Sequence, residues 1–226
     1  MTPLAGAVLD RLVTEYGAAA DPERAAPMVA YMRDQFPFLG ITSVPRRALS
    51  RRVLAGLPPP DEADLVDAAL ACWRLPEREY QLFACDWLVR HAKVLGPGFL
   101  PTLRTLVTTK PWWDTVDALA SGVGGVIVAR HPAARSTMDE WLAGDEMWLI
   151  RVALLHQLNF REATDAAWLF AACAARADHK DFFIRKAIGW ALRQYARTDP
   201  AAVRDFVAAH HDSLSGLSAR EALKHL

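Results

Sequence analysis

Residues 181–200, DFFIRKAIGWALRQYARTDP, show the clearest periodicity in the chain. One set of apolar residues is spaced by four, three and four positions, which is typical of the buried face of an amphipathic helix: Ile184, Ile188, Ala191 and Tyr195. A second face combines aromatic and basic residues: Phe183, Lys186, Trp190, Arg193 and Arg197. Such a face can follow a phosphate backbone while its rings pack against nucleosides. The alternative interpretation is a helix buried on two sides whose Lys and Arg side chains reach outward.

The same helical spacing extends over the rest of the chain, and proline stands near several of the expected helix starts, as at Pro22, Pro132 and Pro200. No segment alternates with the period of two that a strand requires. We therefore predict an all-α protein with helices at 3–16, 22–37, 45–56, 61–73, 77–95, 98–108, 112–120, 122–130, 133–143, 147–158, 162–175, 182–197, 200–210 and 218–226.

Many medium-length helices with short connections favour antiparallel pairs. The pairs recur at roughly 35 to 40 residues, close to the period of about 40 in HEAT repeats. We expect a HEAT-like repeat superhelix, an α-solenoid in one domain over 1–226, which presents one helix of each pair on a concave face. A globular helical bundle is the alternative, because the copies share little sequence. The proline-rich LPPPDE at 57–62 is expected to be a loop within this domain.

Composition limits the classes of function. The chain has 226 residues, 52% of them hydrophobic, and a formal net charge of zero, which counts mildly against nucleic-acid binding. Basic residues nevertheless exceed acidic ones in 1–60 and 151–226, so a local positive surface is compatible with the sequence. No signal peptide or membrane span is evident, and the three cysteines are expected to be buried and reduced. We expect a cytoplasmic monomer.

The segment TTKPWWDTVD at 108–117 is the most unusual one. Pro111 suits a first helical position, and Asp114 suits the positive end of a helix. Trp113 and Asp117 are four positions apart and share a helix face, where an aromatic ring and a carboxylate can flank a cation. Alternatively, the tryptophans pack in the core and the carboxylates are solvated or cap the helix.

Arg151 interrupts an otherwise apolar helix, MWLIRVALLHQL at 147–158. A buried arginine requires a partner, and that partner is either a structural carboxylate or a phosphate of a ligand. The basic run Arg46, Arg47, Arg51 and Arg52 is interpreted as a solvated face. The histidines form no metal-ligand cluster, and motifs of zinc proteases, serine hydrolases and P-loop enzymes are absent, so we expect neither a metal nor a cofactor.

Several blocks in the chain resemble the AlkD family of alkylpurine DNA glycosylases. They are YMRDQFPFLGI at 31–41, PRR at 45–47, LPEREYQ at 75–81, TKPWWDTVD at 109–117, WLIRVALLHQL at 148–158, DFFIRKAIGWALRQYARTDP at 181–200 and SAREALKHL at 218–226. The blocks keep the family order and span almost the whole chain. The resemblance implies a HEAT-like fold whose concave face binds double-stranded DNA carrying alkylated purines, and hence a nucleoid-associated protein when bound.

The resemblance also assigns roles to residues. Asp117 matches the catalytic carboxylate, and Arg151 matches an arginine that contacts phosphate. Aromatic residues match positions that line the cleft: Trp113, Trp190, Tyr31, Phe182 and Phe183. The family resemblance further implies that the enzyme grips the backbone without burying the base.

A purine alkylated at N3 or N7 is already cationic and leaves as a neutral base without a general acid. One carboxylate can then suffice to stabilise the oxocarbenium-like sugar and position water. The resemblance, together with this chemistry, implies a DNA glycosylase of base excision repair. The alternative is a non-catalytic HEAT-repeat scaffold that binds DNA or a protein.

Overall fold

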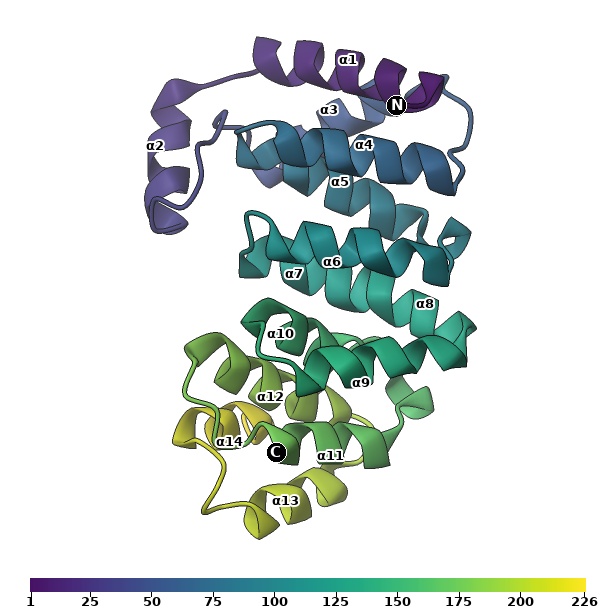
Figure 1. Ribbon diagram of the computed structural model, residues 1–226. Helices are drawn as coiled ribbons and strands as arrows, with labels where there is room; N and C mark the ends of the chain where they lie inside the picture. Colours follow the sequence, from purple (N-terminus) through teal and green to yellow (C-terminus); the bar gives the residue numbers. More distant parts are fainter. The chain divides into compact units, whose positions relative to one another are not determined.

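The computed structural model describes all residues 1–226, and every regular element in it is a helix (Figure 1). The prediction of an all-α, HEAT-like solenoid fold is confirmed. The chain divides into two compact units, unit 1 (Met1–Lys110) and unit 2 (Pro111–Leu226). The single domain expected over 1–226 stays a prediction.

Unit 1 is built from layers of helices joined by short loops. Its elements are α1 (Pro3–Ala18), α2 (Pro22–Tyr31), α3 (Ser43–Leu54), α4 (Glu62–Arg74), α5 (Arg78–Arg90), η1 (Ala92–Val94), η2 (Pro97–Phe99) and α6 (Leu100–Thr108). Helix α4 is central, since it packs against α1, α5 and α6, and α3 packs against α1 and α5. The pair α4 and α5 lies side by side in Figure 1.

Unit 2 repeats this arrangement around α10. Its elements are α7 (Trp113–Leu119), the π-helical turn η3 (Ala120–Gly124), α8 (Gly125–Arg130), η4 (Pro132–Ala134), α9 (Arg135–Ala143), α10 (Met147–Leu155), η5 (Arg161–Ala163), α11 (Ala166–Ala175), α12 (Phe182–Tyr195), α13 (Pro200–Ala209) and α14 (Gly216–Ala222). Helix α10 packs against α7, α9 and α12, and α12 packs in turn against α14. None of the helices in the protein combines the length and the apolar character that a membrane span requires.

Local chemistry explains where the helices begin. Short polar side chains accept a hydrogen bond from the first turn at the N-caps of α2, α12 and α13, where the caps are Asp21, Asp181 and Asp199. The start of α4 carries a full capping box between Asp61 and Asp64. These caps satisfy N–H groups that a helix leaves unpaired at its first turn.

Several predicted boundaries were wrong. The helices predicted at 77–95, 162–175 and 218–226 are α5 (Arg78–Arg90), α11 (Ala166–Ala175) and α14 (Gly216–Ala222). The helix predicted at 22–37 ends at Tyr31, because Arg33 and Asp34 take left-handed backbone angles, φ 55° and 58°. The helix predicted at 122–130 is preceded by the π-helical turn η3, and regular α-helix begins only at Gly125. A Cβ on Gly125 would lie 2.1 Å from the carbonyl oxygen of His156, so this glycine permits the close approach of α8 to the end of α10.

The sequence suggested that the basic run in α3 is a solvated face, and this interpretation is wrong for one of its four arginines. Arg46 is buried, and its Nη1 lies 2.9 Å from Oδ2 of Asp86 on α5. Arg47, Arg51 and Arg52 are exposed. The three cysteines are buried and free, as expected.

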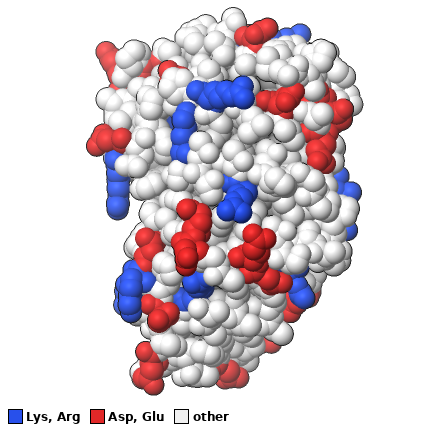
Figure 2. Space-filling model, viewed as in Figure 1, with Lys and Arg blue, Asp and Glu red and all other residues white.

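Charge is distributed without a large patch of one sign on the face shown in Figure 2. Basic and acidic side chains appear there in small groups among uncharged atoms, in keeping with the net charge of zero. Any binding of a polyanion on this face would therefore depend on local groups of basic residues and not on a general positive field.

Candidate functional site

The segment that leads into α7 is shaped by its backbone. Lys110 takes a left-handed conformation, φ 50°, and Trp112 is fully extended as the N-cap of α7. The helix therefore begins at Trp113, and Pro111 lies outside it, not at the first helical position that the sequence suggested. Asp114 does fall in the first turn, where the helix dipole favours a carboxylate.

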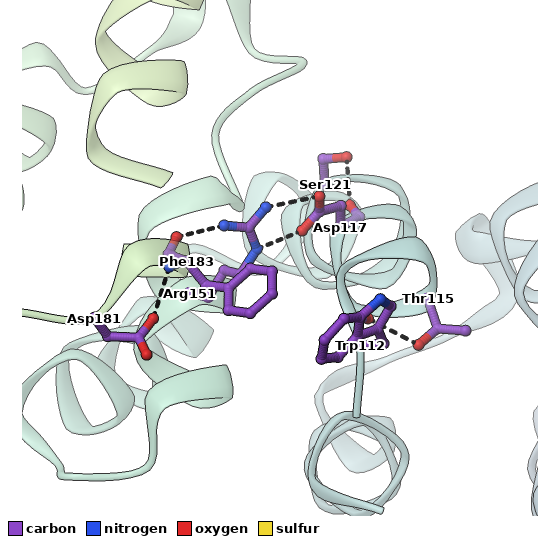
Figure 3. Close-up of polar contacts among 7 residues, drawn as sticks. All are labelled: Trp112, Thr115, Asp117, Ser121, Arg151, Asp181 and Phe183. Carbon is purple, nitrogen blue, oxygen red and sulfur yellow. Dashed lines mark hydrogen bonds and ion pairs between the residues drawn. The ribbon is translucent and has the colours of Figure 1, made fainter. Parts of the chain in front are cut away.

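Asp117 lies one turn further along α7 and forms an ion pair with Arg151 of α10 (Figure 3). Nε of Arg151 donates to Oδ1 at 2.7 Å, and Nη2 donates to Oδ2 at 2.8 Å. Both side chains are largely withdrawn from solvent, with exposed fractions of 15% for Asp117 and 5% for Arg151. The two-point geometry fixes the plane of the carboxylate relative to the guanidinium.

The partner of Arg151, which the sequence left open between a carboxylate and a phosphate, is thus the carboxylate of Asp117. Nη1 of Arg151 also donates to the carbonyl oxygen of Phe183 on α12, so the arginine bridges three helices. A guanidinium has five N–H groups, and these three bonds leave two for another acceptor.

Burial and the arginine act in opposite directions on Asp117. Burial raises the pKa of the carboxyl from its ordinary value of 3.8, whereas the hydrogen bonds and charge of Arg151 lower it and the nearby Asp114 raises it. Burial is the largest of these effects. Asp117 is therefore a carboxylate held in place and deprived of most of its water, which strengthens its interaction with any cation placed beside it.

Three aromatic rings form a cluster next to this ion pair. The ring of Phe183 lies 4.9 Å from Trp148 and 5.2 Å from Trp112, between centroids, and Trp112 lies 6.2 Å from Trp148. The guanidinium carbon of Arg151 is 5.8 Å from the Phe183 ring, within reach of a cation–π interaction. Trp112 and Trp148 were not among the predicted site residues. The extended Trp112 precedes α7, so helical periodicity says nothing about where its ring lies, and Trp148 is one of many apolar residues in α10.

Of the candidate residues in unit 2, direct contacts join Asp117, Arg151 and Phe183, and Phe182 packs edge-on against Phe183. Phe182 is 55% exposed. Trp113 shares a face of α7 with Asp117, and Trp190 lies seven residues after Phe183 on α12, and both tryptophans are half-buried. Tyr31, which ends α2 in unit 1, is 72% exposed.

The basic residues of α12 are mostly engaged within the chain. Nζ of Lys186 lies 2.9 Å from Oε1 of Glu221, and Nη1 of Arg193 lies 2.5 Å from Oε2 of the same carboxylate on α14. Helix α12 is thus covered on two sides, by α10 and α14, as in the alternative interpretation of its pattern. Arg197 follows the helix and is exposed without a side-chain partner. Nothing in the sequence indicated that Glu221 would pair with these residues.

Comparison with known proteins gives two findings. A family model described as DNA alkylation repair enzyme matches residues 12–226. A solved structure described as a predicted DNA alkylation repair enzyme from Enterococcus faecalis is similar to this chain, with a TM-score of 0.83 and 35% sequence identity. The similarity covers 92% of this chain and 96% of the other. No match is found among curated proteins.

Proposed function

The chain belongs to the family of DNA alkylation repair enzymes, and from this we propose that it is a DNA glycosylase that removes cationic N3- or N7-alkylated purines from double-stranded DNA. The observation that carries the proposal is the carboxylate of Asp117, held by Arg151 at 2.7 and 2.8 Å and beside an aromatic cluster. Base excision repair begins with such a step.

In the proposed reaction the bond between C1′ of the sugar and the purine nitrogen breaks, and its electron pair neutralises the cationic base. The sugar becomes an oxocarbenium-like cation, and the carboxylate of Asp117 stabilises that charge. Each carboxylate oxygen has a lone pair beyond the one that accepts from Arg151. One of them can orient the water that attacks C1′ and accept its proton.

The aromatic residues have a supporting role in this proposal. Trp113 and Trp190 pack against the sugar and exclude bulk water, which increases the strength of the electrostatic interaction at Asp117. Phe182 and Tyr31 are exposed and serve as contacts to the nucleic acid. Arg151 uses its remaining N–H groups on a phosphate, and Arg197 offers an unpaired charge.

Lys186 and Arg193 contribute less to DNA binding than their positions on α12 suggest. Their shared partner Glu221 neutralises part of their charge. A DNA phosphate can contact Lys186 or Arg193 only if it displaces Glu221 or binds the same cationic group together with Glu221.

The test is release of base from a duplex that carries 7-methylguanine, measured under single-turnover conditions. Asp117→Asn keeps the shape of the side chain and removes its charge, and we expect excision to slow by at least about 10²-fold, the scale for losing one preorganised electrostatic group. Asp114→Asn, three residues earlier on α7, is the matched control and should retain most of the activity.

Binding measurements help to separate the outcomes. Asp117→Asn should bind undamaged DNA as well as the parent protein or better, since a carboxylate near phosphates is repelled in the ground state. Full activity in this variant would contradict the role of Asp117. Tight binding to alkylated DNA without base release by the parent protein would instead support a non-catalytic scaffold.

A further inference from the structure

A groove with a cavity volume of about 440 Å³ lies in unit 1, at the C-terminal ends of α3 and α5. One part of its lining is basic: Arg51, Arg90 and His91. The other part is apolar and includes Leu57, prolines 58–60 and Trp87. The volume falls within the range of about 300 to 1,000 Å³ that is usual for small-molecule sites.

The two arginines of the groove have no partner within the protein. Arg51 and Arg90 are exposed, form no ion pair and donate no side-chain hydrogen bond, unlike their neighbour Arg52, which pairs with Glu15. No aspartate or glutamate lines the groove. Two guanidinium groups and an imidazole thus converge on a space without a compensating negative charge.

The helix dipole accounts for part of this arrangement only. Arg51 and Arg90 lie in the last turns of α3 and α5, where a basic side chain interacts favourably with the free carbonyl groups. At the end of α3, however, Arg11 already donates to the carbonyl oxygens of Val53 and Ala55. The dipole also gives no reason for both arginines to line one groove.

The mixed lining restricts the chemistry of a ligand. A small inorganic anion would contact the arginines but leave the wall formed by Leu57, the prolines and Trp87 unused. An uncharged apolar molecule would leave the arginines unpaired. The lining fits an anionic group attached to a flat, largely apolar body, and guanidinium groups match phosphate oxygens in geometry and charge.

We propose that this groove binds a nucleotide unit, with its phosphate between Arg51 and Arg90 and its base or sugar against prolines 58–60 and Trp87. His91 donates to the phosphate from the end of α5. The phosphate can belong to a free nucleotide or to a nucleic-acid strand, and the recognition chemistry is the same in both. The proposal does not depend on the excision reaction.

His91 provides a direct readout. Burial and then the charge of Arg90 lower the pKa of His91 from its ordinary value of 6.5. A phosphate placed beside the ring would stabilise the imidazolium form and raise that pKa. The ring resonances of His91, assigned with a His91→Gln variant, can be followed by NMR during titration with deoxyadenosine monophosphate, inorganic phosphate or an undamaged DNA duplex.

We expect deoxyadenosine monophosphate or the duplex to shift the His91 signals and raise the midpoint of the pH titration of His91. A shift with the mononucleotide identifies a free-nucleotide site, and a shift with the duplex alone assigns the groove to a strand. In the double variant Arg51→Gln/Arg90→Gln, the affinity for whichever ligand shifts His91 should fall by at least about tenfold, which corresponds to about 1.4 kcal/mol of binding free energy. Arg47→Gln, an exposed arginine of α3 outside the groove, is the matched control and should not weaken it.

Three results would overturn the proposal. The first is that neither the mononucleotide nor the duplex changes the NMR signals of His91. The second is that the double variant shows the same ligand-induced shifts as the parent protein. The third is that inorganic phosphate binds as tightly as the mononucleotide or the duplex. Because base excision is measured separately with 7-methylguanine, failure here and failure of the proposed glycosylase activity are distinguishable.

Discussion

Arg151 and Asp117 form a two-point ion pair, with hydrogen bonds of 2.7 Å from Nε to Oδ1 and 2.8 Å from Nη2 to Oδ2. The residue proposed to contact phosphate is therefore the same residue that orients the proposed catalytic carboxylate. Its effects on binding and on the chemical step are distinguishable by experiment.

The first prediction concerns pH. Arg151 lowers the pKa of Asp117 against the effect of burial, so Arg151→Ala should leave that pKa higher than in the parent protein. Because the ionised carboxylate is the active form, the loss of excision on acidification should begin at a higher pH in the variant. Single-turnover rates measured as a function of pH would test this, with Arg151→Lys, which keeps the charge but loses the two-point geometry, as the comparison. If the excision rate fell at the same pH in the parent protein and in both variants, the predicted effect of Arg151 on the pKa of Asp117 would be contradicted.

Arg151→Ala should also change DNA binding. If Arg151 contacts a phosphate, the loss should weaken binding similarly for all DNA sequences and reduce the slope of log K against log salt by about 0.9. Fluorescence anisotropy over a range of salt concentrations measures both effects. Unchanged affinity at low salt would limit the role of Arg151 to holding Asp117.

Glu221→Gln tests the charges on α12. The change releases Lys186 and Arg193 from their carboxylate, so affinity for undamaged DNA should rise, and the salt slope should steepen by about 0.9 for each cation that gains a phosphate. Asp205→Asn removes one exposed negative charge from α13 and is the control. Equal effects of the two variants would mean that net charge alone is responsible.

Glu221→Gln should also change the stability of the fold. The hydrogen bond from Lys186 is the first cause that lowers the pKa of Glu221, with the charges of Lys186 and Arg193 adding to it. A carboxyl with a lowered folded-state pKa stabilises the fold above its unfolded-state pKa and loses this contribution as pH falls through the folded-state value. Urea unfolding should therefore show Glu221→Gln as less stable than the parent near pH 7, by a margin that shrinks on acidification.

Lesion charge should govern the rate of excision. The neutral base hypoxanthine leaves poorly without protonation, and no general acid is evident among the proposed site residues, so it should be released far more slowly than 7-methylguanine. Duplexes that differ only in this base would measure the ratio. Comparable rates would require a proton donor and would contradict a mechanism with Asp117 alone.

The sequence predicted all fourteen helices because their apolar spacing and caps are local properties. It failed where the backbone departs from helical geometry, as at Arg33 and Asp34, and where a residue finds a partner far along the chain. Arg46 with Asp86 and Lys186 with Glu221 are such pairs, and their spacing of 35 or more positions carries no periodic signal. The sequence did single out Asp117 and Arg151, yet only the packing of α7 on α10 shows that they bind each other.

The three-helix bridge of Arg151 also bears on how this protein can change over evolutionary time. Unpaired catalytic groups often cost stability, so their loss can be tolerated or even favourable for folding. Here, loss of either member of the pair leaves a charge withdrawn from water without its partner, which is among the costly substitutions. A descendant that no longer needed the activity would still lose stability on replacing Asp117 or Arg151 alone, so the presence of both in a relative would not by itself establish that the relative is active.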